Sequence, residues 1–146
     1  MADSEQRSEK PRFEVRTTAE SHFSWLRTRM SVERTLMSWV RTATALIGFG
    51  FTIFQFLGKF NETAGVEAAR HPLAPWFLSL GLIGTGIVAL IIAVREYRMV
   101  IGYLWDKDFK PIAGVNESYH YTPIVAVSVV LIFIGVFAFA AVFLRV

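Results

Sequence analysis

Three arginines at regular spacing are the residues best suited to chemistry in this chain. Arg27, Arg34 and Arg41 lie seven residues apart, before and just inside the first apolar stretch. On an α-helix this spacing places their side chains in one column along the axis. Each guanidinium is a planar fork of N–H donors that matches a phosphate or a carboxylate. The spacing therefore predicts a basic column that binds an anion.

The same arginines have a second interpretation, and the sequence leaves both open. Arg41 lies about one turn inside the apolar stretch, where a charge costs ~2.5 kcal/mol or more unless it reaches water or a partner. Its long side chain can extend back to the membrane surface, or it can pair with a carboxylate. The ion-pair candidates are Glu33 and Glu96. In this interpretation the arginines serve only membrane topology and helix packing.

Small residues recur every four positions in two apolar segments. This spacing lets two helix backbones approach closely in a membrane, so it predicts helix packing. On the opposite side of the first helix, Trp39, Leu46 and Ile53 are bulky and suited to lipid. The residues predicted to pack are Thr44, Gly48 and Thr52 in the first segment and Gly81, Thr85 and Ala89 in the second.

Three apolar segments must position these residues, at about 36–58, 75–94 and 123–144. Each is about twenty residues long, which at ~1.5 Å per residue matches the ~30 Å hydrocarbon layer. We therefore predict an all-α membrane protein with three transmembrane helices in a domain of residues 20–146. Residues 1–19 are polar and predicted to be a disordered cytoplasmic N-terminus. The first helix is extended by an amphipathic cytoplasmic helix, with Phe23, Leu26, Met30 and Met37 on its apolar face.

The distribution of basic residues predicts the orientation. Of fifteen Lys and Arg, eight lie in residues 1–41 and four in the second loop, 95–122. The positive-inside rule therefore places both in the cytoplasm and the C-terminus outside. The same bias explains the pI of about 9.5, so no nucleic acid partner is expected.

Catalytic motifs are not found in this sequence. It has no glycine-rich phosphate loop, no HExxH and no nucleophile elbow, and it contains no cysteine. The second and third apolar segments carry no charge that could act in a membrane-embedded active site. We expect no enzyme, no catalytic residue, no cofactor and no metal site.

The run V-E-R-T-L-M-S-W-V-R-T, from Val32 to Thr42, is the most specific motif. It resembles the N-E-R-T-x-x-(A/S)-W-x-R-T signature of the small bacterial inner-membrane family that includes YidH, with Val32 in place of the usual Asn. The run R-E-Y-R at 95–98 resembles the basic segment after that family's second span. The resemblance covers about residues 20–146 and implies three spans in a bacterial inner membrane.

This family's membrane domain is similar to that of the eukaryotic vacuolar transporter chaperone, whose three-helix subunits surround a path for polyphosphate. The resemblance implies a homo-oligomer in the lipid bilayer, with a basic cytoplasmic mouth that binds or conducts an anion or polyanion. It is a likeness of fold, and activity need not transfer with it. The alternative is a structural or scaffolding membrane protein that anchors an unidentified protein partner. The positions implied to contact a polyanion are Arg34, Arg41, Arg95 and Arg98.

Overall fold

The protein is described by a computed structural model that covers residues 15–63, 74–114 and 123–144, excepting the side chains of 57–63. Within these ranges all regular structure is helical: α1 (Ala19–Thr63), α2 (Ala74–Leu104), α3 (Lys110–Ala113) and α4 (Pro123–Phe143). Three of them, α1, α2 and α4, are long and apolar enough to cross a membrane. The predicted all-α membrane architecture is confirmed. The predicted disorder of residues 1–19 falls mostly outside the described residues, which begin at residue 15.

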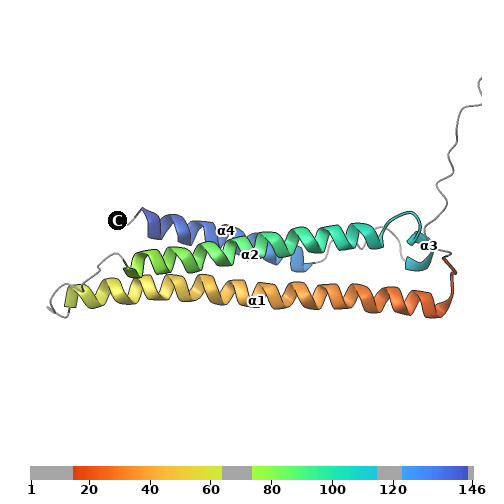
Figure 1. The fold of residues 1–146 in the computed structure, drawn as a ribbon, viewed down its shortest axis with the longest axis horizontal. Coiled ribbons are helices and arrows are strands. Elements are labelled where there is room, and N and C mark those ends of the chain that lie inside the picture. Colours follow the sequence, from red (N-terminus) through yellow and green to blue (C-terminus); the bar gives the residue numbers. More distant parts are fainter. Residues whose placement is uncertain (1–14, 64–73, 115–122, 145–146) are drawn as a thin grey trace, which may run out of the picture.

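Helix α1 runs along the whole length of the molecule, with α2 beside it (Figure 1). The helix begins after Thr18, whose Oγ1 accepts a hydrogen bond from the Ser21 backbone N–H at 3.2 Å. The carboxylate of Glu20, in the first turn, is stabilised by the positive end of the helix dipole. Its 45 residues span about 67 Å at ~1.5 Å per residue. Since this is about twice the hydrocarbon thickness, about half of α1 projects beyond the membrane. The predicted unbroken extension of the first span is confirmed.

Two glycines set the close approach of α1 and α2. A Cβ added at Gly50 of α1 would lie 2.7 Å from Ile83 Cγ1 and 2.8 Å from the Ser79 carbonyl oxygen. A Cβ added at Gly86 of α2 would lie 2.9 Å from Ile47 Cγ1. These contacts leave no room for a side chain at either position, so the two backbones meet there.

Helix α4 closes the end of the bundle that carries no charged residues in the described part. Gly135 faces Ile87 of α2, where an added Cβ would lie 2.9 Å from Ile87 Cγ1. At the end of α4, the carbonyl of the buried Val142 accepts a hydrogen bond from Trp76 Nε1 at 3.2 Å. The buried Ser128 bonds to the carbonyl one turn earlier on its own helix, so it needs no partner on another helix.

The small residues predicted to pack lie outside the closest contacts between helices of one chain. Gly48 and Gly81 are exposed, and a Cβ added at either meets nothing within 4 Å. Thr44, Thr52 and Thr85 are also exposed and donate to the carbonyl four residues earlier, whereas Ala89 is half-buried. Within the described part of one chain, the closest packing therefore uses Gly50 and Gly86. Packing by the predicted set stays a prediction for contacts between chains.

The buried side of α1 also differs from the predicted one. Phe23, Met30 and Met37 are 63%, 59% and 53% exposed, whereas Trp25 and Leu36 are buried. The extension carries two apolar lines, and the tertiary contacts select the line that faces α2. Nearer the far end, Leu46 and Ile53 are half-buried rather than fully exposed to lipid. They lie on the flank of the side that packs against α2.

Helix α2 continues ten residues past the predicted end of the second span. Residues 95–104, predicted as the start of a loop, form its last turns. Tyr97 and Leu104 recur at helical spacing and pack on Leu36 and Trp25 of α1. The α1 extension provides the apolar surface that keeps this segment helical.

We predict that Gly50→Ala destabilises the bundle by about 1–3 kcal/mol. The added methyl meets a backbone carbonyl, which moves only if the helices separate. Gly102→Ala, at an exposed position on α2, meets open space and is expected to be neutral or slightly stabilising, because alanine favours helix. Thermal unfolding of both variants in detergent checks this. Equal stability of the two variants would contradict the close approach at Gly50.

Candidate functional site: a basic face on the first helix

Two of the predicted arginines line a surface pocket of about 610 Å³ between α1 and the start of α4. The pocket lies where the apolar part of α1 gives way to its charged extension. Its walls combine cationic, thioether and apolar side chains. The lining residues are Met30, Glu33, Arg34, Met37, Ser38 and Arg41 of α1 with Pro123 and Ile124 of α4.

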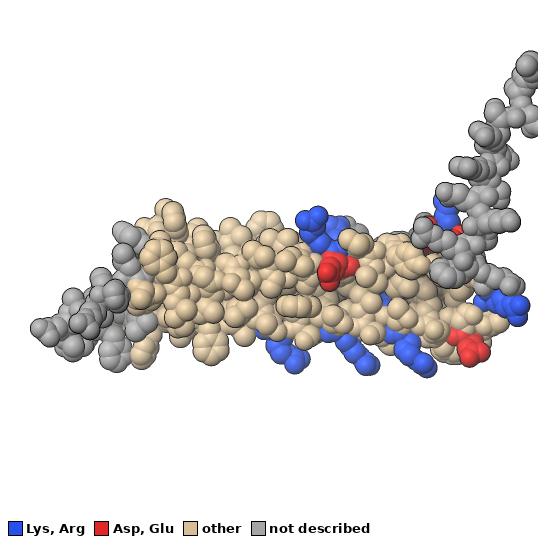
Figure 2. Space-filling model, viewed as in Figure 1, with Lys and Arg blue, Asp and Glu red and all other residues tan. Residues whose placement is uncertain are grey.

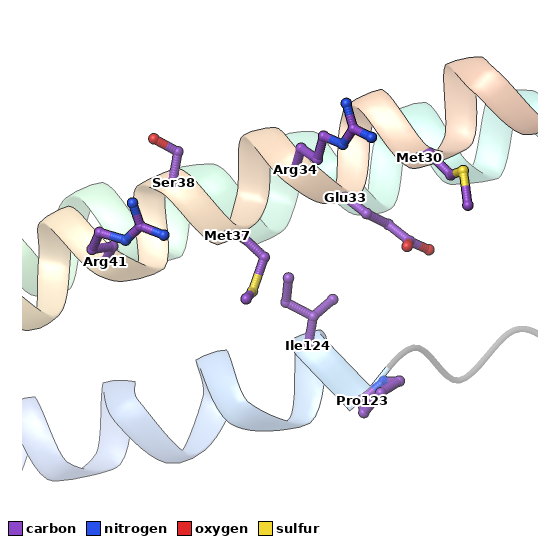
Figure 3. Close-up of a pocket in the computed structure, with 8 residues that line it drawn as sticks. All are labelled: Met30, Glu33, Arg34, Met37, Ser38, Arg41, Pro123 and Ile124. Carbon is purple, nitrogen blue, oxygen red and sulfur yellow. The ribbon is translucent and has the colours of Figure 1, made fainter.

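Three polar side chains of this pocket point the same way, and Glu33 points away from them (Figure 3). Arg34, Ser38 and Arg41 project to one side of α1, while Met37 points toward Ile124 of α4. Both arginines are exposed. Within the residues described, neither guanidinium forms an ion pair. Two cationic forks with free N–H donors therefore lie on one side of the helix, an arrangement that can accept a phosphate or carboxylate.

Arg27 extends this basic face by one heptad toward the N-terminus. It is exposed but does not line the pocket. Figure 2 shows Lys and Arg side chains in a row along the α1 edge of the molecule, whereas the left part of this view shows no charged side chain among the described residues. We call Arg27, Arg34 and Arg41 the basic face, and the end of the molecule that holds it the charged end.

Glu33 pairs with a different arginine from the one considered in the sequence. Its Oε1 lies 3.4 Å from Arg29 Nε, one turn earlier on α1. The Arg29 guanidinium carbon also lies 5.8 Å from the Trp25 ring centroid, a cation–π contact. Glu33 therefore pairs with Arg29 and points away from Arg34 and Arg41 (Figure 3), whose charges remain unmatched in the described part of the chain.

Glu96, the other ion-pair candidate, lies on the other side of α1 from Arg41. It lines a second pocket of about 650 Å³, together with Trp39 of α1. Trp39 and Arg41 differ by two positions, about 200° around a helix, so the two pockets open in different directions. The other residues of this second pocket, which we call the α2 groove, are Leu80, Gly81, Gly84, Thr85, Val88, Ala89, Ile92 and Ala93.

Arg95 and Arg98 flank Glu96 on α2 and are exposed. They line neither the basic-face pocket nor the α2 groove. The structure thus brings Arg34 and Arg41 together in one pocket and keeps the α2 arginines apart from them within one chain.

The sequence did not reveal what holds the basic face in place. The buried Trp25 donates from Nε1 to the Leu104 carbonyl at 3.0 Å, and its ring meets Trp105 edge-on with centroids 5.6 Å apart. His22 donates from Nδ1 to the Ile112 carbonyl at 2.7 Å. We call these contacts the clasp. The signal for it was a large aromatic residue within a polar segment.

The α3 helix owes its position to the same clasp. Gly114 follows it in the left-handed conformation, with φ of 60°, which glycine adopts without strain. Its Cα faces the His22 ring, since an added Cβ would lie 3.6 Å from that ring. The buried Ala113 packs against Trp25. The clasp therefore joins the α1 extension to the end of α2 and to α3.

The fold and the position of the basic face define a multi-pass, all-helical membrane protein. Residues 24–102 match the family described as a domain of unknown function, DUF202, and the chain belongs to that family. The match runs through most of the α1 extension, the first membrane helix and most of α2, so it includes the whole basic face. Comparisons with curated proteins and with solved structures gave no match.

The family assignment confirms the resemblance based on residues 32–42. Val32, which replaces the Asn of that signature, packs against the cluster of Leu36 and Tyr97. An apolar side chain suits this half-buried position between α1 and α2.

We predict that Trp25→Phe loosens the clasp without unfolding the membrane helices. The ring is largely replaced, but the Leu104 carbonyl loses its donor, which costs about 1–2 kcal/mol. Amide hydrogen exchange of residues 105–113 should accelerate, while exchange in α4 stays unchanged. Trp39→Phe is the control, because Trp39 is 46% exposed and lies outside the clasp. Unchanged exchange in 105–113 of Trp25→Phe would refute this role.

Proposed function

We propose that the chain is the subunit of a homo-oligomeric bacterial inner-membrane protein that binds, and conducts, an anion or polyanion at its basic face. The observation that carries the proposal is the pair of exposed guanidinium groups of Arg34 and Arg41, which share a pocket and a direction. Neither has an ion-pair partner in the described part of the chain. The proposal assigns binding and passage, and no catalytic step.

The position of Arg41 supports an anionic ligand on energetic grounds. Arg41 lies about one turn inside the apolar stretch, where a charge costs ~2.5 kcal/mol or more unless it reaches water or a partner. Glu33 is drawn toward Arg29 and Glu96 lies on another side of α1. No carboxylate of the same chain therefore compensates the basic face in the described residues, which favours binding of an anion from solution, and a polyanion spans the spacing between successive arginines.

The exposed stripe of Thr44, Gly48 and Thr52 supports a homo-oligomer. These residues continue the basic face into the apolar half of α1, and within the chain the stripe remains exposed. Small residues at this spacing gain dispersion energy when another helix packs on them. Several copies would also bring several basic faces together, which raises the local field on an anion.

The uneven distribution of Lys and Arg supports a cytoplasmic location for the basic face. Twelve of fifteen Lys and Arg lie in residues 1–41 and 95–122, so we place the charged end in the cytoplasm and the C-terminus outside. The basic face then forms a cytoplasmic mouth. The likeness to the membrane domain of the vacuolar transporter chaperone makes inorganic polyphosphate the first polyanion to test.

We predict that Arg34→Gln with Arg41→Gln strongly weakens binding of inorganic polyphosphate to the protein in nanodiscs. Two charge-assisted hydrogen-bonding groups are lost, each worth ~1.5 kcal/mol or more, so affinity falls by about a hundredfold or more. Arg34→Lys with Arg41→Lys keeps the positive charges but not the planar guanidinium groups, so its affinity should lie between those of the wild type and the Gln variant. Filter binding at low and high salt measures these affinities, and phosphate flux into proteoliposomes measures conduction.

The matched control removes two positive charges elsewhere, with Lys107→Gln and Lys110→Gln. This variant should bind polyphosphate within about twofold of the wild type, because its charges lie outside the basic face and are screened over ~10 Å at 0.1 M salt. No binding by the wild type, or an equal loss in the control, would overturn the proposal.

The scaffolding alternative is favoured by one observation, the exposure of Phe23 and Met30. Both lie on the part of α1 that precedes the apolar span, where a large exposed apolar side chain suits a protein partner. If this alternative holds, Phe23→Ser with Met30→Ser releases a stoichiometric co-purifying protein and leaves the helix content by circular dichroism unchanged. Absence of any such protein from the wild type removes the alternative.

A further inference from the structure

We propose that the α2 groove is the docking site for the stripe on α1 of a neighbouring copy of the chain, and that the neighbour's α2 supplies Glu96 to Arg34 and Arg41. The inference rests on the oligomeric half of the proposed function and adds the contact surfaces and a residue shared between copies. The α2 groove and the stripe lie on different sides of one chain, so the contact is head to tail. Contacts of this kind form a ring when the rotation from one copy to the next closes.

The heights of the two surfaces come from contacts within one chain. Helices α1 and α2 run in opposite directions, with Ile47 beside Gly86 and Gly50 beside Ile83. Leu36 and Tyr97 share a cluster further along. In each pair a step forward on α1 matches an equal step back on α2, as expected for two helices of equal rise.

The same register aligns the small residues of both surfaces. It places Thr44 at the height of Ala89, Gly48 at the height of Thr85, and Thr52 at the height of Gly81. Copies related by an axis along the membrane normal share one height, so the three pairs stay aligned between neighbours. Small residues opposite one another let two backbones approach, and the open space at Gly48 and Gly81 leaves room for that approach.

The charges of the two surfaces are complementary at one height. In the same register Glu96 is level with Met37, so it lies between Arg34 and Arg41 along the axis. The offsets are three and four residues, about 4.5 and 6 Å. Side chains lean toward the N-terminus of their own helix, and since α1 and α2 are antiparallel, Arg41 and the neighbour's Glu96 lean toward each other. All three side chains are exposed and, in the described part of the chain, make no ion pair.

A symmetric contact between two α1 stripes is disfavoured by the same charges. It would bring two basic faces together without a carboxylate between them, and like charges across an interface cost several kcal/mol. The head-to-tail contact instead places one carboxylate between Arg34 and Arg41. Of the three positive charges of the basic face two then remain uncompensated, and each guanidinium has five N–H donors, so an anion can still bind beside Glu96.

Cysteine cross-linking in native membranes tests the contact, since the chain has no cysteine of its own. Two differently tagged copies are co-expressed, one with Gly48→Cys and one with Thr85→Cys. Oxidation should yield a dimer that carries both tags, whereas either variant expressed alone should yield none. A dimer from Gly48→Cys alone would show a symmetric contact and overturn the proposal. No dimer from the mixture would show that the stripe does not lie in the α2 groove of a neighbour and would overturn the proposal as well.

The matched control pairs Gly48→Cys with Val136→Cys on α4. Gly135 lies beside Ile47, so Val136 is at a similar height and is exposed, but it is outside the α2 groove. This pair should not cross-link, and equal cross-linking would attribute the signal to random collision.

Charge reversal provides a second test that does not depend on cysteine. Glu96→Arg should cause loss of the oligomer in detergent, measured by light scattering, and Arg41→Glu in the same chain should restore it. Failure of the double variant to reassemble, with helix content unchanged, would overturn the shared ion pair. Both tests measure assembly without any anion. If the wild-type protein cross-links as expected but shows no anion flux in proteoliposomes, the proposed function is refuted and this contact still stands.

Discussion

The hydrocarbon layer accommodates about twenty helical residues, and α1 has 45. This excess of length governs the rest of the structure. The surplus turns stand outside the layer, where charge is tolerated, and they continue the same helical faces that lie inside it. The basic face and the stripe of small residues are therefore one surface on one helix. The end of α2 and the short α3 gain their helical form because the projecting part of α1 offers them an apolar side to pack on.

The positions of a few glycines determine where the backbones of the membrane helices approach most closely. Gly50 and Gly86 admit the neighbouring backbone, and the side chains between them fill in around that approach. The hydroxyls in this region bond within their own helices, so the contact between helices depends on shape. A contact that depends on shape fixes the rotation of α1 strictly, since a rotation of one residue would bring a side chain against a carbonyl.

The sequence predicted the three membrane helices, their order and the unbroken extension, because hydropathy over twenty residues is a property of composition and needs no tertiary contact. It also predicted that Arg34 and Arg41 share a side of α1, since that follows from helical spacing alone. It did not predict which side is buried. The extension has apolar lines through both Phe23 and Trp25, and the choice between them depends on where the end of α2 lies.

The clasp could not be predicted from the sequence for a related reason. Trp25 and His22 bond to backbone carbonyls of residues 104 and 112, and a carbonyl has no sequence signature. The small residues illustrate the same limit. Gly48 and Gly50 have equal claims to packing by composition, but they differ by about 200° around the helix, and only the fold shows which one faces α2.

The clasp and the Gly50 contact together hold α1 at two points along its length. The first contact is near the N-terminal end of α1, through Trp25, and the second is in its membrane half, where the backbones of α1 and α2 meet. Between them the helix is continuous, so the two contacts set one rotation for the projecting turns and the buried half alike. The direction in which the basic face points relative to the membrane helices is therefore fixed by packing within one chain.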